Sequence, residues 1–256
     1  MPRFVRYAAT SGPEFGIVDD TGVRAIEGHP FGEWADTNRQ VPLDRLRLLA
    51  PIIPTKVVAV GRNYAAHAQE MGGEVPAEPL LFFKPTTAII GPGDPILYPT
   101  DLTSLVHHEA EIAVVVGAKL TRASVAEAAE GIAGYTAAND VTARDLQRAE
   151  PQWARGKGMD TFLPLGPSMT TELDLADTRV VCRVNGQVRQ DGTTADLVFD
   201  VPTLLSHISQ SITLLPTDVV LTGTPAGVGP IEPGDTVEVE VTGIGSLVNP
   251  VVARPT

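Results

Sequence analysis

The stretch His107 to Gly117, HHEAEIAVVVG, carries the pattern that decides the fold. Side chains of a β-strand alternate between two faces, so apolar residues at every second position share the face that packs into the core. Here these residues are Ile112, Val114 and Val116. Glu109 and Glu111 then share the opposite face, and His108 points away from both glutamates. The stretch therefore predicts a strand with one apolar face and one carboxylate-bearing face.

Similar β-type runs continue on both sides of this stretch, and helices are few. The expected strands include KVVAVG, LLFFK, GIAGYTAA, RVVCRVNG, DVVLTG and DTVEVEV, and Asn185-Gly186 predicts a hairpin. The expected helices are Ser124 to Glu130, Thr142 to Ala149 and Pro202 to Ile212. Because strands do not alternate regularly with long helices, the pattern argues against a doubly wound sheet or a (β/α)₈ barrel. It predicts a mainly β, α+β fold: a mixed β roll with short helices.

The first fifty residues contain short strand-like pieces, RFVRYAA and GIVDD, joined by turns. Pro51 and Pro54 then interrupt the chain. The sequence therefore predicts a small N-terminal domain, residues 1–50, and a main domain, residues 51–256.

Composition narrows the possible functions. The chain has 256 residues, a net charge of −12 at pH 7 and a pI near 4.8. An acidic surface repels phosphate backbones and anionic membranes, so neither nucleic acid nor a membrane is expected as a partner. No apolar run approaches the ~20 residues of a membrane span, and the start MPRFVRYAATSG lacks the apolar core of a secretion signal. Cys182, the one cysteine, excludes an internal disulfide and is expected to be a small buried side chain. These features predict a cytoplasmic enzyme.

Asp140 ends the apolar run GYTAAND and supplies a third carboxylate. Two like charges on one strand face repel each other unless a cation or solvent relieves them. Three carboxylates without a nearby cysteine suit a hard divalent ion, Mg²⁺ or Mn²⁺, rather than zinc. Spacing alone leaves two alternatives: the face with Glu109 and Glu111 is solvated, or Asp140 caps the helix that follows it.

The segment GRNYAAHAQEMGG, Gly61 to Gly73, predicts a short helix framed by glycines. His67 and Glu70 are three residues apart, so on a helix their Cβ atoms lie ~5–6 Å from each other. A carboxylate beside an imidazole orients the ring and raises its basicity, which makes a general base. The flanking glycines could let the segment move as a lid. The alternative is a surface helix whose pair is only solvated charge.

Two lysines and one loop are further candidates for substrate binding. Lys84 ends the run LLFFK, and Lys157 has a glycine on each side, which permits close backbone approach to a ligand. Either ammonium could hold a carboxylate or an oxyanion, although a solvated lysine is the usual alternative. The loop LTGTPAGVGP, Leu221 to Pro230, could offer backbone N–H groups and the Thr224 hydroxyl to a carboxylate. Nucleotide-binding glycine motifs are absent from the sequence.

Seven segments, in this order, resemble the fumarylacetoacetate hydrolase superfamily: VGRNYAAHAQEM, EPLLFFKP, HHEAEIAVVVG, GYTAANDVTARDLQ, GKGMDTFLPLGP, VNGQVRQDG and VVLTGTPAGVG. The resemblance implies a β roll of mixed sheets and a homodimer. It implies that the metal ligands are Glu109, Glu111 and Asp140. It implies that the catalytic residues are His67 and Glu70, as a lid dyad, and Lys157. It also implies that the substrate-binding positions include Arg62, Tyr64, Lys84, Arg144, Gln147 and Thr224.

Such a site would chelate a 2-oxo acid or diacid on Mg²⁺ or Mn²⁺ and stabilise an enolate. The dyad favours C–C bond cleavage, by acylpyruvate hydrolysis or oxaloacetate decarboxylation, because isomerisation needs no activated water. The alternative is 2-hydroxyhepta-2,4-diene-1,7-dioate isomerisation or 5-oxopent-3-ene-1,2,5-tricarboxylate decarboxylation. A C7 diacid would need a second cationic anchor, for which Arg144 and Lys84 are the candidates. A binding protein without catalysis and a structural β protein with a solvated acidic face are the other two readings.

Overall fold

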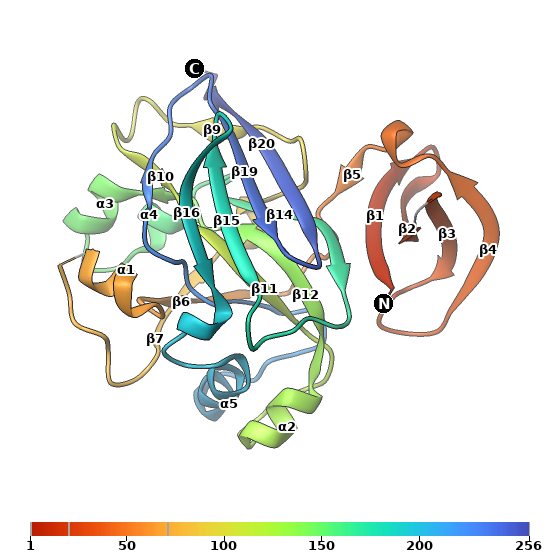
Figure 1. Cartoon of the computed structure of the whole chain (residues 1–256), viewed down its shortest axis with the longest axis horizontal. Helices are drawn as coiled ribbons and strands as arrows, with labels where there is room; N and C mark the ends of the chain where they lie inside the picture. The colour runs from red at the N-terminus through yellow and green to blue at the C-terminus, as the bar shows by residue number, and fades with distance from the viewer. Residues whose placement is uncertain (1, 20, 71, 256) are drawn as a thin grey trace.

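The computed structural model describes residues 2–19, 21–70 and 72–255. Strands make up most of the regular structure and the helices are short (Figure 1). The predicted mainly β, α+β class is therefore confirmed.

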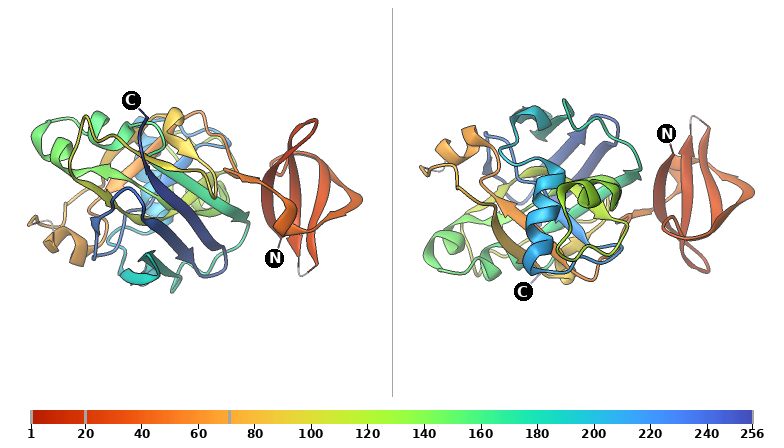
Figure 2. Two further views of the ribbon diagram at one scale, coloured as in Figure 1. Left: turned by 90° about the horizontal axis from the view of Figure 1, so that it is seen from above. Right: turned by 90° about the horizontal axis from the view of Figure 1, so that it is seen from below.

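Four antiparallel strands begin the chain and lie to one side of the molecule (Figures 1 and 2). They are β1 (Arg3–Ala9), β2 (Gly12–Asp19), β3 (Gly22–Gly28) and β4 (Trp34–Val41), followed by η1 (Leu43–Arg45) and β5 (Leu48–Leu49). These strands have a small core of their own, formed by Val5, Tyr7 and Val23. The sheet nevertheless continues into the rest of the chain, because β1 also pairs with β14 (Leu163–Thr170).

The central part of this sheet carries the site and runs in the order β14, β12, β11, β17, β6, β7. The further members are β6 (Val57–Gly61), β7 (Leu80–Lys84), β11 (Ala110–Val116), β12 (Ile132–Asn139) and β17 (Val219–Leu221). Alternate residues of β11 pack into the larger core cluster, as predicted: Ile112, Val114 and Val116. Ala113 and Val115 pack on its other face into a second cluster. Both faces of β11 are buried, so a side chain at its start is buried as well.

A five-stranded sheet packs across β11 and β12 (Figure 1). It consists of β9 (Ile96–Tyr98), β15 (Arg179–Val184), β16 (Gln187–Thr193), β19 (Thr236–Val241) and β20 (Gly245–Ala253). The predicted hairpin joins β15 to β16, and Asn185 and Gly186 both have positive φ, 54° and 77°, as such a two-residue turn requires. Cys182 is buried on β15, as predicted, and burial raises the pKa of its thiol to about 12.

The predicted continuous strand from His107 to Gly117 is two strands, which corrects the expectation. The first, β10 (Val106–His108), ends before Glu109 and pairs with β13 (Thr142–Ala143) and β18 (Gly229–Pro230) in a separate three-stranded sheet. The break has a local cause, since the Glu109 N–H donates to the side-chain oxygen of Asn139 at 2.9 Å.

In the part of the chain that the structure describes, five short helices complete the fold: α1 (Ala65–Glu70), α2 (Val125–Glu130), α3 (Arg144–Ala149), α4 (Ala154–Gly158) and α5 (Val201–Ser211). Shorter elements are η2 (Thr86–Ala88), β8 (Ile89–Ile90) and η3 (Thr194–Asp196). Ser124 caps α2 and forms a capping box with Glu127. The helix expected from Thr142 begins only at Arg144, because Thr142 and Ala143 pair with β10 instead. Within the described ranges, no helix has both the length and the apolar character to cross a membrane.

Candidate active site and metal centre

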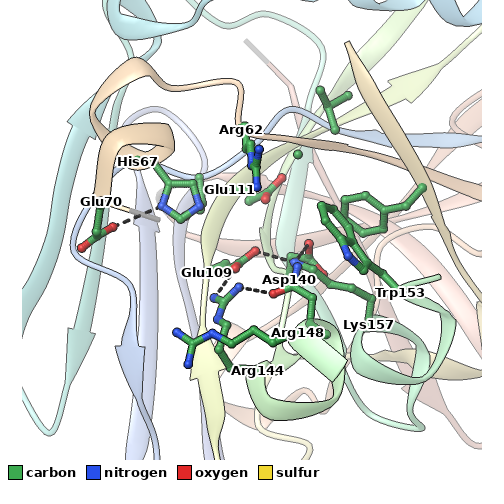
Figure 3. A pocket seen from close by; sticks show the side chains of 15 residues that line it. Arg62, His67, Glu70, Glu109, Glu111, Asp140, Arg144, Arg148, Trp153 and Lys157 are labelled. Carbon is green, nitrogen blue, oxygen red and sulfur yellow. Dashed lines mark hydrogen bonds and ion pairs between the residues drawn. The ribbon is translucent and has the colours of Figure 1, made fainter. Parts of the chain in front are cut away.

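The cavity that brings the predicted site residues together measures about 290 Å³ and lies where β6 and β12 end and β11 begins (Figure 3). Its charged wall consists of Arg62, Glu70, Glu109, Glu111, Asp140, Arg144, Arg148 and Lys157. His67 faces the same space. Residues far apart in the sequence therefore form one densely charged, concave site.

Three carboxylates form one group in this cavity. Glu109 lies at the break between β10 and β11, Glu111 lies on β11, and Asp140 follows β12. In the β11–β12 register Ala110 pairs with Asn139, so the start of one strand lies beside the end of the other. One oxygen from each carboxylate lies within 4.8 Å of the others.

Both alternatives for these carboxylates are excluded. Glu109, Glu111 and Asp140 are at most 3% exposed, so the acidic face is not solvated. Asp140 does not cap α3 either, because the N-cap is Ala143 and no side chain caps that helix.

Three buried cations neutralise two of the carboxylates. The Lys157 ammonium lies 2.6 Å from Glu109 and 2.6 Å from Asp140, Lys84 donates to Asp140 at 2.6 Å, and Arg144 pairs with Glu109. Burial opposes ionisation of Glu109, but Lys157 and Arg144 outweigh it and lower its pKa. Burial likewise works against the charge of Lys157, yet Asp140 and Glu109 raise its pKa. Glu109 and Lys157 therefore stabilise each other in their charged forms.

Glu111 differs from its two neighbours. It accepts a hydrogen bond from the Gly223 N–H at 2.8 Å, but no cation among the described residues forms an ion pair with it. Burial raises its pKa well above the usual range, and the charges of Asp140 and Glu109 add to that effect. A buried carboxylate that faces two others without its own cation fits a metal ligand. The all-oxygen donor set suits a hard divalent ion, so this group could hold Mg²⁺ or Mn²⁺.

The histidine–glutamate pair lies on α1 at the cavity. His67 Nδ1 lies 3.2 Å from Glu70 Oε2, and His67 is only 6% exposed. The Gly227 N–H donates to both oxygens of Glu70, at 3.0 and 3.2 Å. A surface helix with solvated charges does not describe this arrangement, because the imidazole is buried and turned toward the carboxylate group (Figure 3).

The loop from Leu221 to Pro230 uses its N–H groups differently from what the sequence predicted. Its N–H groups were expected to bind a substrate carboxylate, but those of Gly223 and Gly227 bind the protein's own Glu111 and Glu70. The Thr224 hydroxyl lines the cavity and donates to the Ala110 carbonyl at 2.8 Å. The loop therefore links the carboxylate group to the histidine–glutamate pair.

The predicted substrate-binding positions divide into two groups. Four of them line the cavity: Arg62, Arg144, Gln147 and Thr224. Lys84 and Tyr64 are not among the described residues that line it. Lys84 donates to Asp140 from behind the cavity wall, and Tyr64 is buried and forms a backbone bridge with Leu197. Arg62 has a φ of 58°, an uncommon value for a residue with a side chain and one found at ligand sites.

Lys157 lines the cavity on α4, and its glycine neighbours serve packing instead of ligand approach. A Cβ on Gly156 would lie 2.9 Å from the Gln147 nitrogen, and one on Gly158 would lie 2.8 Å from Pro85. The glycines thus allow α4 to lie close to α3 and β7, which places the lysine.

The cavity residues that sequence reasoning missed include three large side chains: Phe82, Arg148 and Trp153. Arg148 follows Gln147 and is four residues after Arg144, so helical spacing alone could have placed it on the same face. Phe82 and Trp153 form an edge-to-face pair with ring centroids 5.3 Å apart. No motif indicates Trp153, because only the fold brings it to Phe82.

Comparison with known proteins agrees with this geometry. Residues 56–252 match the family model of the fumarylacetoacetate (FAA) hydrolase C-terminal domain, and residues 3–51 match the model "Rv2993c-like, N-terminal". The chain belongs to the fumarylacetoacetate hydrolase family. The resemblance inferred from seven sequence segments is confirmed, and the protein is an enzyme of this family.

Three relatives indicate the chemistry found in the family. The structure of 5-carboxymethyl-2-hydroxymuconate delta-isomerase from Mycobacterium smegmatis is 50% identical, with a TM-score of 0.91 over 98% of this chain and 100% of that one. That of 2-hydroxyhepta-2,4-diene-1,7-dioate isomerase from Mycobacterium marinum is 45% identical, with a TM-score of 0.91 over 100% of both chains. Mitochondrial oxaloacetate tautomerase FAHD2A from Bos taurus is 42% identical over 83% of this chain and 71% of its own.

Replacing Glu111 by Gln tests the carboxylate group as a metal site. The amide keeps the shape and removes a carboxyl group whose ionisation is opposed by burial and by Asp140 and Glu109, so Glu111→Gln should be at least as stable as the parent protein without metal. With Mn²⁺ at 100 times Kd, linkage should stabilise the parent by about 2.7 kcal/mol and the variant much less. Chemical denaturation with and without Mn²⁺ measures both effects. The exposed Glu130→Gln is the control, and equal Mn²⁺ stabilisation of all three proteins would contradict the assignment.

Proposed function

We propose that the protein is a divalent-metal-dependent enzyme that forms an enolate from a 2-oxo dicarboxylate and moves its protons, in keto–enol or double-bond isomerisation. Glu111 carries the proposal, because it is a buried carboxylate that faces Glu109 and Asp140 and lacks its own cation among the described residues. The names of the relatives support proton transfer as the reaction, since two are isomerases of unsaturated acids and one is a tautomerase of oxaloacetate.

The site would first stabilise the enolate. A divalent ion held by the three carboxylates would polarise the oxygens of the substrate's 1-carboxylate and 2-oxo group. The Lys157 ammonium, 2.6 Å from both Glu109 and Asp140, lies beside that position and would donate a hydrogen bond to the oxyanion. Its burial strengthens the interaction because little water competes.

His67 would move the proton. Glu70 accepts a hydrogen bond from Nδ1, which fixes the tautomer with a lone pair on Nε2. The imidazole takes a proton from the carbon beside the 2-oxo group, whose C–H electron pair becomes the enolate double bond while the carbonyl pair moves to oxygen. The imidazolium then returns the proton to the enolate oxygen, or to a more distant carbon of a conjugated chain.

A second carboxylate on the substrate would meet Arg62 or Arg148. Arg144 and Lys84, the anchors expected from sequence, already pair with Glu109 and Asp140. Arg62 and Arg148 also line the cavity, and neither forms an ion pair with another described residue. Guanidinium groups bind carboxylates through two parallel hydrogen bonds, so these two arginines favour a diacid.

C–C bond cleavage is the second candidate, and the histidine–glutamate pair favours it. His67, oriented by Glu70, which in turn accepts from the loop, could equally take a proton from water that attacks a 4-oxo carbon. The C3–C4 bond would then break and its electron pair would stay with the enolate. Both reactions need the same stabilised enolate.

Product analysis with a substrate panel tests the proposal. The panel is oxaloacetate, a C7 dienedioate, acetylpyruvate and fumarylpyruvate, each with Mg²⁺, with Mn²⁺ and after chelation. We expect metal-dependent tautomerisation or double-bond shift of the first two, and loss of at least about 90% of the activity after chelation, because the oxyanion loses its Lewis acid. Release of pyruvate as the main product would favour cleavage. Full turnover after complete metal removal would refute the metal-dependent function.

His67→Ala is expected to lower kcat by about 100-fold, the usual contribution of a positioned general base, with a smaller change in KM. Steady-state kinetics on the best panel substrate measure it. His207→Ala, on α5 and away from the cavity, is the matched control and should keep kcat. A fully active His67→Ala would exclude the imidazole from proton transfer.

Arg148→Ala should raise KM about 10-fold for a diacid and leave KM for acetylpyruvate unchanged, since one charge-assisted hydrogen bond is worth about 1.5–3 kcal/mol. The ratio of the two KM values is the measurement. Arg45→Ala, which removes an exposed arginine of η1, should leave the ratio at its parent value. Equal changes in KM for the diacid and for acetylpyruvate would show that Arg148 does not bind the second carboxylate.

A further inference from the structure

One polar side chain outside the cavity lining connects its two centres. Gln190 lies on β16, the edge strand of the five-stranded sheet, and is 1% exposed. The other residues of β16 are exposed or half-buried, so this strand directs an amide into the interior. A buried amide is costly unless all its hydrogen-bonding groups have partners.

All the hydrogen-bonding groups of Gln190 are satisfied. Its Oε1 accepts from His108 Nδ1 and from the Ala110 N–H, both at 3.0 Å. Its Nε2 donates to Thr224 Oγ1 and to the Pro225 carbonyl, both at 2.7 Å. One side of the amide thus holds the backbone between Glu109 and Glu111, and the other side holds the loop.

The loop is also packed tightly on β16. A Cβ on Gly227 would lie 2.1 Å from the Arg189 carbonyl oxygen, and one on Gly192 would lie 2.5 Å from Pro225. Only glycine allows such close approach at these positions. The loop therefore takes its position from β16, on both sides of Gln190.

The same loop donates one N–H to each functional centre. Gly223 donates to Glu111 in the carboxylate group at 2.8 Å, and Gly227 donates to Glu70 beside His67. A shift of the loop would therefore move both hydrogen bonds at once.

We infer that Gln190 is a positioning residue that fixes the loop Gly223–Gly227 and thereby sets Glu111 and the His67–Glu70 pair relative to each other. The inference rests on the proposed function, because it needs a metal at Glu111 and proton transfer at His67. Gln190 does not line the cavity. It reaches the His67–Glu70 pair only through the loop, and it reaches the carboxylate group both through the loop and through the Ala110 N–H.

Gln190→Glu separates the two sides of the amide. A carboxylate can still accept from His108 and Ala110, but it cannot donate to Pro225, and the Thr224 hydroxyl is already committed to Ala110. The substitution therefore removes only the hydrogen bonds to the loop. We expect Mn²⁺ affinity and kcat each to fall about 10–100-fold, as for other residues that orient metal ligands. Gln187→Glu, at an exposed position of the same strand, makes the same chemical change in water and should alter neither.

The experiment titrates Mn²⁺ by calorimetry and electron paramagnetic resonance into the parent, Gln190→Glu and Gln187→Glu, with thermal melts to confirm folding. Gln190→Met, which removes the charge as well as the donors, replaces Gln190→Glu if that variant does not fold. A parent that fails to bind Mn²⁺ would refute the proposed function. A parent that binds, together with a folded Gln190 variant of unchanged affinity and kcat, would overturn the inference alone.

A double-mutant cycle separates positioning from general destabilisation. If Gln190 aligns the His67–Glu70 pair, His67→Ala should cost much less in the Gln190→Glu background than in the parent. A merely structural role predicts that the two losses in kcat multiply. Multiplying losses would overturn the link between Gln190 and the proton-transfer pair.

Discussion

The burial of three carboxylates around one point is the constraint on which the rest of the site depends. Removing charges from water is costly, and close cations recover that cost only with good geometry. Lys157 on α4, Lys84 at the end of β7 and Arg144 on α3 provide those cations from three different elements. Glu111 keeps only a backbone N–H. An arrangement that leaves one buried carboxyl group without its own cation serves ligand binding more than stability.

The same arrangement would support more than one reaction. Enolate stabilisation needs a cation, a second positive charge and a movable proton, and the carboxylate group, Lys157 and His67 would supply them for isomerisation or for cleavage. The sequence favoured cleavage because a dyad can activate water. The names of the relatives favour proton transfer. Arg62 and Arg148 would instead determine the choice of substrate, because under the proposed function they would bind a second carboxylate in either reaction.

Much of this site could be predicted from local patterns. The alternation in Ile112 to Val116 places the core face of β11, and the three-residue spacing of His67 and Glu70 places the dyad. Features that depend on distant partners could not be predicted. The strand break at Glu109 depends on a side chain from β12, and the role of Lys84 depends on Asp140, which lies far along the chain. The loop glycines looked like ligand donors because their acceptors, Glu111 and Glu70, belong to other segments.

The short pairing of β1 with β14 has a consequence for any attempt to obtain a minimal fragment. Phe4 lies opposite Met169, and Arg3 opposite Thr170, so the N-terminal strands cover that end of β14. A fragment that began after Leu49 would retain every cavity residue but would expose unpaired amides along a hydrophobic strand. An unpaired edge strand of this kind can pair with strands of other molecules. Such a fragment would then fail because it aggregates, and not because it lacks cavity residues.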